Sequence, residues 1–353
     1  MRLYLFVLGR NPVLSLAEII SYLRNKNFSF EIIEHTDEIA KIEIENFNSK
    51  EHIKNLGGTL KIAYKIDSLN DIVLDKNKIR FSVSGIHFDK DLLIKKLKNK
   101  LKEENVKAII KYGKSDLITP KQSKNLDLEI VGYKDELYFV EAVSDPYSYK
   151  QRDIKRPAYD PLKSTSIRLA KIMINLAQPK KEIADPFCGQ GTILQEALIM
   201  NYNCIGLDLN AKESRINLKW LGNKYNGKYK VIDGDARRLS KYLKEAECIV
   251  TEPYLGPYLK RKYQLQDLMR IIKELNFIYS DFIKETYKII KGKIVVIVPG
   301  FKFNSRLYKT DFDRIIRENK LKVVAPLNSI NMPLHYKVKG SIIERFIYIL
   351  ERQ

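Results

Sequence analysis

The chain has 353 residues, of which 44% are hydrophobic, and it carries 63 Lys and Arg residues against 43 Asp and Glu. A chain of this length normally divides into two or more domains. No apolar run reaches the length of a membrane span, and the short apolar start reads as a first strand, not a signal peptide. The three cysteines show no paired metal-binding spacing, which favours reduced core thiols, a cytoplasmic location and no metal site.

The net charge of +20 lies mostly in the C-terminal part of the chain. Residues 1–150 have 25 basic against 22 acidic side chains, whereas residues 151–353 have 38 against 21. An excess of positive charge favours binding to a polyanion such as a nucleic acid, because neutralised phosphates release counterions. A lysine-rich proteome or the charged surface of a thermophilic protein would give the same excess.

The first 145 residues are predicted to form an α+β region. Apolar residues follow the spacing of strands in five short runs and the spacing of helices in two others. The last two strands flank Lys134 and Asp135 and therefore predict a hairpin. The expected strands are 3–8, 29–34, 39–44, 128–132 and 137–143, and the expected helices are 13–25 and 89–102.

A segment rich in Pro, Tyr and charged residues follows at 146–163 and is interpreted as a linker. Ser164 or Thr165 can then cap a helix that ends at Ala177. Strands and helices alternate from there to about residue 298, which is typical of a doubly wound α/β sheet. Two later apolar runs would complete the sheet as an antiparallel pair; they lie at 322–325 and 342–350.

A nucleotide-binding turn is predicted where the first strand of this sheet ends. The strand ends in Asp185 and is broken by Pro186, which lacks a backbone N–H. Gly189 and Gly191 then allow left-handed torsions and the close approach of a ligand, and a helix begins at Thr192. A ligand would therefore lie over the N-terminus of that helix.

Three further strands deliver acidic residues to the same edge of the sheet. Asp208 can accept hydrogen bonds from ribose hydroxyls, and Asp235, in Gly-Asp-Ala, can accept one from an adenine amine. The fourth strand delivers Glu252. A dinucleotide fingerprint would need a third glycine where Leu194 stands, so a methyl donor fits better than a hydride carrier. The alternative is an ordinary tight turn in an α/β protein.

These motifs resemble, in their order, those of the Rossmann-like amino-methyltransferase superfamily. More narrowly, the chain resembles the THUMP-containing tRNA guanine N2-methyltransferases, the archaeal and eukaryotic group that modifies guanosine 10 of tRNA. The resemblance spans most of the chain, and its most specific parts are Asp-Pro-Phe-Cys-Gly at 185–189 and Arg-Asp at 152–153. Further matches are Gly9-Arg10-Asn11-Pro12, Leu16-Ala17-Glu18, residues 56–62, Arg156-Pro157 and residues 172–177.

The resemblance implies a domain order and a cofactor. A ferredoxin-like subdomain at 1–55 and a THUMP domain at 56–145, which in the family grips the acceptor end of tRNA, would precede the linker at 146–163. A class I, Rossmann-like methyltransferase domain would occupy 164–353. The methyl donor of the family is S-adenosylmethionine. The residues expected to hold it are Asp185, Phe187, Gly189, Gly191, Asp208, Leu209, Asp235 and Ala236.

The catalytic loop of the family reads Asp-Pro-Pro-Tyr or Asn-Pro-Pro-Tyr, whereas this chain has Thr251-Glu252-Pro253-Tyr254. In the family, the acid and a proline carbonyl accept hydrogen bonds from the target amine, and the aromatic ring stacks on a flipped base. Counting back from Tyr254 makes Thr251 the equivalent of the acid, while aligning the strand end makes Glu252 the acid. We favour Glu252, because it keeps a carboxylate. The alternative is a simple turn with Tyr254 packed in the core.

The favoured function is methylation of the guanine N2 amine in tRNA. A DNA adenine N6-methyltransferase would use a similar loop, and a tRNA-binding protein with an inactive loop would keep the same domains. Eukaryotic relatives need a small zinc-binding partner, which leaves room for an activating protein here. The basic residues expected to contact RNA are Arg152, Arg156, Lys260, Arg261 and Lys262.

Overall fold

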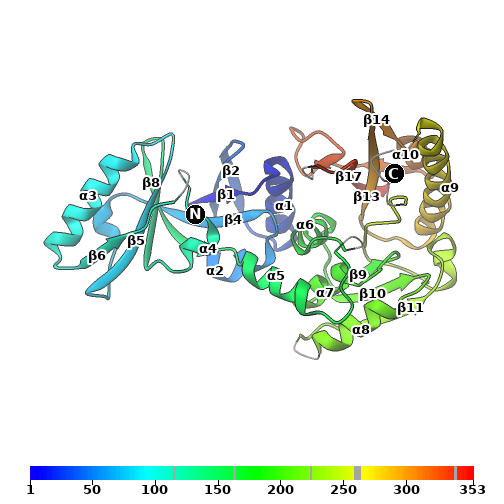
Figure 1. Cartoon of the computed structure of the whole chain (residues 1–353), viewed down its shortest axis with the longest axis horizontal. Helices are drawn as coiled ribbons and strands as arrows, with labels where there is room; N and C mark the ends of the chain where they lie inside the picture. The colour runs from blue at the N-terminus through cyan, green and yellow to red at the C-terminus, as the bar shows by residue number, and fades with distance from the viewer. Residues whose placement is uncertain (114–116, 162–163, 223–224, 258–263, 338–339) are drawn as a thin grey trace. The chain divides into compact units, whose positions relative to one another are not determined.

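The computed structural model describes residues 1–113, 117–161, 164–222, 225–257, 264–337 and 340–353 (Figure 1). The chain folds into two compact units. One unit consists of Met1–Pro12 and Asn27–Gln151, and the other of Val13–Lys26 and Arg152–Gln353. None of the helices in the described ranges combines the length and the apolar character that a bilayer span requires.

The N-terminal unit is built on one mixed sheet. Its elements are β1 (Arg2–Leu8), β2 (Phe30–His35), β3 (Ile39–Ile44), α2 (Ser49–His52), η1 (Ile53–Asn55), β4 (Thr59–Ile66), η2 (Leu69–Asp71), β5 (Lys78–Ile86), α3 (Lys90–Glu103), β6 (Lys107–Ile110), α4 (Pro120–Ser123), β7 (Leu128–Tyr133) and β8 (Glu136–Val143). The strand order is β2-β3-β1-β4-β8-β7-β5-β6, and β5 runs parallel to both β6 and β7. Leu93 and Leu97 of α3 pack against Phe81 and Ile130 of the sheet.

The structure contains the five strands and two helices that the sequence predicts for this region, and three strands that it does not. The additional strands are β4, β5 and β6. In β5, the buried residues Ile79, Phe81 and Val83 recur every second position, so a strand signal was present in the sequence and was overlooked. The α+β character is therefore confirmed, while the THUMP assignment of 56–145 stays a prediction.

The C-terminal unit is a doubly wound α/β sheet. Its elements are α6 (Ile167–Ala177), β9 (Glu182–Asp185), α7 (Thr192–Ile199), β10 (Asn203–Asp208), α8 (Lys212–Leu221), β11 (Tyr229–Asp233), η3 (Ala236–Lys241), β12 (Ile249–Thr251), α9 (Leu265–Ile289), β13 (Ile294–Phe303), β14 (Arg306–Lys309), α10 (Phe312–Glu318), β15 (Leu321–Val323), β16 (Leu334–Tyr336) and β17 (Ile343–Arg352). The strand order is β11-β10-β9-β12-β13-β17-β15, with β14 paired to β13 and β16 paired to β17. The first five strands of this order are parallel.

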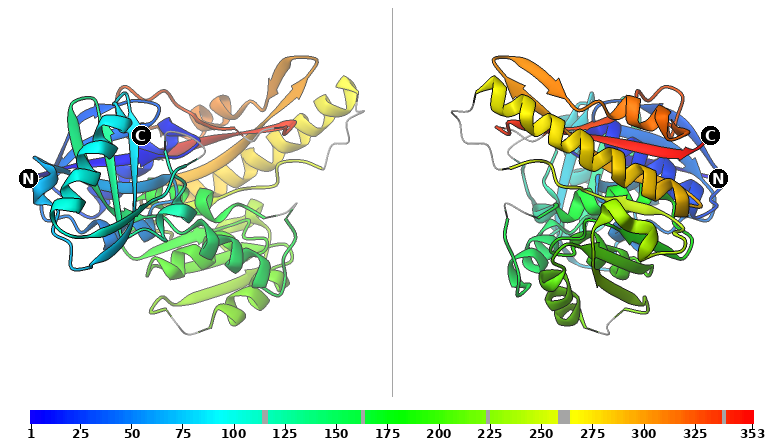
Figure 2. Two further views of the ribbon diagram at one scale, coloured as in Figure 1. Left: turned by 60° about the vertical axis from the view of Figure 1, so that its left-hand side comes forward. Right: turned by 90° about the vertical axis from the view of Figure 1, so that its right-hand side faces the viewer.

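The predicted Rossmann-like sheet is confirmed, including its late antiparallel strands. β17 pairs antiparallel with both β13 and β15, as the apolar runs at 322–325 and 342–350 predict. Figure 2 shows the long helix α9 lying along β13 and β17. Leu275 and Phe282 of this helix belong to the same buried cluster as Val296 and Tyr348 of the two strands.

The helix α1 (Pro12–Asn25) folds almost entirely with the C-terminal unit. Glu18 of α1 is buried, and its Oε1 accepts a hydrogen bond from Asn175 Nδ2 of α6 at 2.8 Å. Asn25 Nδ2 donates to the carbonyl oxygen of Pro179 at 2.9 Å. These polar pairs join segments more than 150 residues apart. The predicted domain boundary at residue 55 would have placed α1 in the N-terminal subdomain.

The segment predicted as a linker begins with a helix, α5 (Pro146–Lys155), which carries the chain from one unit into the other. The predicted cap of α6 is corrected by one residue. Ser166 is the N-cap, and its side chain accepts a hydrogen bond from the backbone N–H of Leu169 at 3.2 Å. Ser164 and Thr165 therefore keep their hydroxyl groups for other contacts.

Candidate active site

The glycine turn after β9 has the left-handed torsions that its sequence predicts. Gly189 has a φ of +48° and Gly191 a φ of +80°. A Cβ added to Gly189 would meet no atom within 4 Å, whereas one added to Gly191 would lie 2.7 Å from Ser214 Oγ. Gly191 is therefore needed for close packing against α8, and Gly189 leaves open space in which a ligand can approach the backbone.

Asp208, at the end of β10, holds this turn with its side chain. Its Oδ2 accepts a hydrogen bond from the backbone N–H of Gly189 at 2.9 Å, and its Oδ1 accepts one from Asn210 at 3.2 Å. Each carboxylate oxygen has a second lone pair, so both can accept another hydrogen bond. The next residue, Leu209, is 75% exposed and offers an apolar surface beside the carboxylate. A nucleoside ligand fits this pair of residues.

Asp235 is already engaged by its own neighbour. It caps η3, and its two oxygens bind the guanidinium of Arg237 through contacts of 2.7 to 3.1 Å. The hydrogen bond from Arg237 is the main cause of a lowered pKa of Asp235. The sequence pattern did not indicate that a residue two positions away would occupy this carboxylate. Ala236, which follows, is buried.

Asp185 and Thr251 form a buried pair at the ends of β9 and β12. Thr251 Oγ1 donates to Asp185 Oδ1 at 2.6 Å, and the backbone N–H of Phe187 donates to the same oxygen at 3.2 Å. Burial is the main cause that raises the pKa of Asp185 to about 7; the hydrogen bonds from Thr251 and Phe187 act in the opposite direction, and the nearby carboxylates of Asp208 and Glu252 add to the rise. Thr251 has no exposed surface, so its predicted catalytic role is corrected to one of holding Asp185.

Glu252 follows β12, and its side chain is 11% exposed. Its Oε1 accepts a hydrogen bond from Arg345 Nε of β17 at 2.6 Å, and its Oε2 accepts one from Thr165 Oγ1 at 2.5 Å. The sequence predicts neither of these partners. Arg345 was detectable as a charged residue within the apolar run 342–350, but its target was not.

The loop after Glu252 keeps an aromatic side chain accessible. Tyr254 is 49% exposed, whereas Pro253 is buried. The carbonyl oxygen of Tyr254 accepts a hydrogen bond from the hydroxyl of Tyr279, a buried residue of α9, at 2.7 Å. The alternative in which Tyr254 packs in the core is therefore wrong, because the loop is fixed by its backbone and its ring faces outward.

Phe187 lies at the start of the glycine turn, after Pro186. It is partly buried, and its ring makes an edge contact with Phe282 of α9 at a centroid distance of 5.1 Å. This contact fixes an apolar side chain two residues after Asp185, in the turn where the resemblance places the cofactor.

Two of the predicted RNA contacts are structural ion pairs. Arg156 has no exposed side-chain surface; it donates to Thr192 Oγ1 at 2.7 Å, binds Ser164 and pairs with Asp153. Its predicted contact with RNA is therefore wrong. Arg152 is mostly buried and binds both carboxylate oxygens of Glu196 at 2.9 and 3.1 Å.

The arginines at 152 and 156 tie the end of α5 to α7, whose Glu196 also lies 3.5 Å from Lys171. Sequence alone shows a basic cluster here but not that its charges face the protein interior. The other predicted RNA contacts, Lys260, Arg261 and Lys262, lie outside the described residues.

The cysteines are buried, as the sequence predicts. Burial raises the pKa of Cys248 to about 11 and also raises the pKa values of Cys188 and Cys204. Within the described ranges, no group of three or more His, Cys, Asp and Glu side chains is arranged to hold a metal ion.

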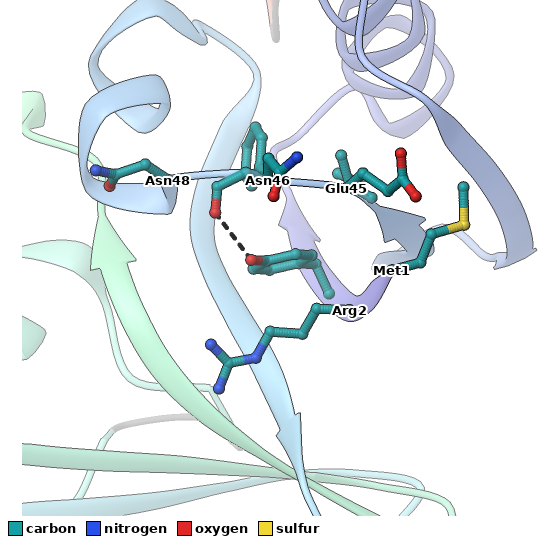
Figure 3. Close-up of a pocket in the computed structure, with 8 residues that line it drawn as sticks. Met1, Arg2, Glu45, Asn46 and Asn48 are labelled. Carbon is teal, nitrogen blue, oxygen red and sulfur yellow. Dashed lines mark hydrogen bonds between the residues drawn. The ribbon is translucent and has the colours of Figure 1, made fainter.

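A separate hollow of about 500 Å³ lies in the N-terminal unit (Figure 3). Tyr4 donates its hydroxyl hydrogen to the carbonyl oxygen of Phe47 at 2.9 Å there, and the guanidinium of Arg2 lies 3.4 Å from the ring centre of Tyr64. The hollow contains none of the predicted site residues. Its lining consists of Met1, Arg2, Tyr4, Ile44, Glu45, Asn46, Phe47 and Asn48.

The family described as RMKL-like, methyltransferase domain, matches residues 152–323. Two similar curated proteins are both named tRNA (guanine(10)-N2)-dimethyltransferase. The one from Pyrococcus abyssi is 26% identical over 189 residues, which are 52% of this chain and 49% of the relative. The one from Methanothermobacter thermautotrophicus is 36% identical over 119 residues, 32% of this chain and 34% of the relative. The matched stretches thus span about a third to a half of the length of these relatives.

Two solved structures resemble the whole chain in fold. TrmN from Thermus thermophilus has a TM-score of 0.52 at 13% identity, covering 99% of this chain and all of the other. A possible methylase from Clostridium difficile 630 has a TM-score of 0.50 at 13% identity, covering 100% and 98%. The family match falls on the unit that holds the glycine turn and Glu252, so over residues 152–323 this unit is similar to the RMKL-like methyltransferase domains.

Proposed function

We propose that this protein transfers a methyl group from S-adenosylmethionine to the N2 amine of guanine in tRNA, at guanosine 10. The observation that carries the proposal is the hydrogen bond from Thr251 to Asp185, which joins the strand end before Glu252 and the half-exposed Tyr254 to the strand end before the glycine turn, within the residues that match a methyltransferase domain. The names of the archaeal relatives support the choice of substrate, and the excess of positive charge in residues 151–353 is consistent with RNA.

The residues around the glycine turn fit the cofactor. S-adenosylmethionine supplies an electrophilic methyl group when it is bound. The open space over Gly189 lets the cofactor approach the protein backbone closely. The lone pairs of Asp208 that the protein does not use can accept hydrogen bonds from the ribose hydroxyls. Leu209 offers an apolar surface to the adenine, and Phe187 to the methionine side. Asp235 can contribute to adenine binding only if Arg237 releases it.

Glu252 can orient the target amine. The lone pair of a guanine amine is conjugated with the ring, so the amine is a weak nucleophile whose hydrogens must be held by acceptors. Each oxygen of Glu252 uses one acceptor site within the protein and retains another for an amine hydrogen. Methyl transfer would form one N–C bond and break the S–C bond of the bound donor, whose sulfur would leave as a neutral thioether, while one amine hydrogen would be released as a proton to water. The exposed ring of Tyr254 can stack on the flipped base.

The proposal is tested by labelled methyl transfer to an unmodified tRNA transcript, followed by digestion and mass identification of the nucleoside. We expect N2-methylguanosine or its dimethyl form. A matched transcript with adenosine at position 10 should accept no methyl group. Modification of a different guanine would contradict only the assignment to position 10. N6-methyladenine in a DNA substrate would instead favour a DNA adenine N6-methyltransferase. Binding of cofactor and tRNA without transfer would indicate a protein whose loop is inactive.

A further inference from the structure

The carboxylate of Glu252 is held from two elements that are distant in sequence. Thr165 stands directly before the N-cap of α6, and Arg345 lies in β17. They are 87 and 93 residues away from Glu252, and each binds a different carboxylate oxygen.

The sheet explains how Arg345 reaches the end of β12. β13 lies between β12 and β17, with Thr251 paired to Val296 and Pro299 paired to Arg345. Pro299, the residue of β13 that faces Arg345, lies three positions after Val296. Arg345 is therefore displaced from Thr251 towards the carboxyl ends of the parallel strands. Its long side chain spans the width of one strand to contact Glu252 at 2.6 Å.

Glu252 has more need of such contacts than an aspartate would. A glutamate side chain has an additional rotatable bond, so its carboxylate loses more rotamer freedom when it is fixed. It is also close to other titratable groups, namely Asp185 of β9 and the hydroxyl of Tyr279 of α9, whose pKa values it raises. The permanently charged guanidinium of Arg345 offsets the second negative charge at this edge.

We propose that Arg345 and Thr165 are positioning residues that fix the Glu252 carboxylate as a hydrogen-bond acceptor for the target amine. This inference rests on the proposed function, because it takes the guanine amine as the group whose hydrogens Glu252 accepts. The partners fill the protein-facing acceptor sites of the two oxygens and leave the remaining sites for substrate. The contacts replace the rigidity that a shorter acid would have.

The first experiment separates positioning from binding. Arg345→Gln should lower kcat by about 100-fold, as expected for a displaced reacting group, while the KM for tRNA and the cofactor Kd change less than about twofold. Arg345→Lys should recover part of kcat, because it restores the charge but not the fork geometry. Thr165→Val should lower kcat by about tenfold, and Thr165→Ser should keep it. Arg317→Gln, which removes an exposed charge from α10, is the matched control and should be neutral.

The second experiment tests whether Arg345 acts through Glu252. In a Glu252→Gln background, Arg345→Gln should cause little further loss of kcat, because the carboxylate that it positions is gone. Thermal unfolding of the wild type, the two single variants and the double variant gives a second cycle. The Tm of the double variant should be no lower than that of the less stable single variant. Additive losses in either cycle, or an unchanged kcat in Arg345→Gln, would overturn the inference.

The two proposals fail in different ways. A wild-type protein that transfers no methyl group to any nucleic acid contradicts the proposed function, and the unfolding cycle then still decides whether Arg345 and Glu252 are coupled. A wild-type protein that is active, together with an Arg345→Gln variant of equal kcat, contradicts only the positioning role.

Discussion

The hydroxyl of Thr251 donates to the carboxylate of Asp185 over 2.6 Å and so joins the last residue of β12 to the last residue of β9. Both residues are buried. The pair lies under the two features that the proposed reaction brings together, the glycine turn after Asp185 and the Glu252 loop after Thr251. The hydrogen bond thus links, beyond the pairing of β9 and β12 in the sheet, the two strand ends from which these features start.

Asp185 should give the fold a distinct pH dependence. Burial raises its pKa to about 7, against about 3.9 for an unfolded aspartate. The folded protein holds this proton more tightly than the unfolded chain, so the stabilisation is fully present below about pH 4 and is lost as the pH rises through 7. The free energy of unfolding of the wild type, relative to Asp185→Asn, should fall by up to about 4 kcal/mol over this range.

Urea unfolding at a series of pH values measures this difference. Asp233→Asn is the control, because the hydrogen bond from Arg215 lowers the pKa of Asp233, and its contribution should be lost in the opposite direction, as the pH falls. Parallel curves for the wild type and Asp185→Asn would contradict the raised pKa.

Asp208 should be the carboxylate on which cofactor affinity depends most. Asp208→Asn keeps an acceptor for the N–H of Gly189 but loses the charge that strengthens hydrogen bonds from ribose hydroxyls. We expect the cofactor Kd to rise about 10- to 100-fold, measured by calorimetry. Asp235→Asn should raise it less, because Arg237 already occupies that carboxylate. A larger effect at Asp235 would show that Arg237 releases it when the cofactor binds.

The sequence predicts the strand ends of the site but not the contacts between them. Asp185, Asp208 and Glu252 could be located because parallel strands bring their carboxyl ends to one edge of a sheet. Arg345 and Thr165 could not be assigned to Glu252, because their contact depends on strand order and on the entry of α6, which local periodicity does not encode. The sequence also did not show that Arg237 would bind the carboxylate of Asp235.

Burial of charge is the other property that the sequence did not reveal. Arg152 and Arg156 were predicted as RNA contacts because they lie in a basic cluster. In the structure their partners are Glu196, Thr192 and Asp153, two of which come from a helix about 40 residues later. A basic cluster indicates an RNA surface only when no acidic or hydroxyl partner folds onto it.

Removal of the Glu252 carboxylate should separate chemistry from cofactor binding. Glu252→Ala should lower methyl transfer by at least about 100-fold, because the amine loses its acceptor, while cofactor affinity should stay within about twofold. Single-turnover transfer of labelled methyl to tRNA and calorimetry with the cofactor measure the two quantities. Full transfer by the variant would show that another group orients the amine.

Arg156 should matter for stability and not for RNA affinity. Its side chain is fully buried against Asp153 and Thr192, so Arg156→Gln removes the partner of the half-buried Asp153 carboxylate and of the Thr192 hydroxyl, which costs about 2 to 3 kcal/mol in the free energy of unfolding. Arg317→Gln, an exposed change of the same kind, should cost less than about 0.5 kcal/mol. Urea unfolding gives the stabilities, and filter binding of tRNA below the unfolding transition gives the affinities. A loss of tRNA affinity in folded Arg156→Gln, without loss of stability, would return this arginine to the RNA surface.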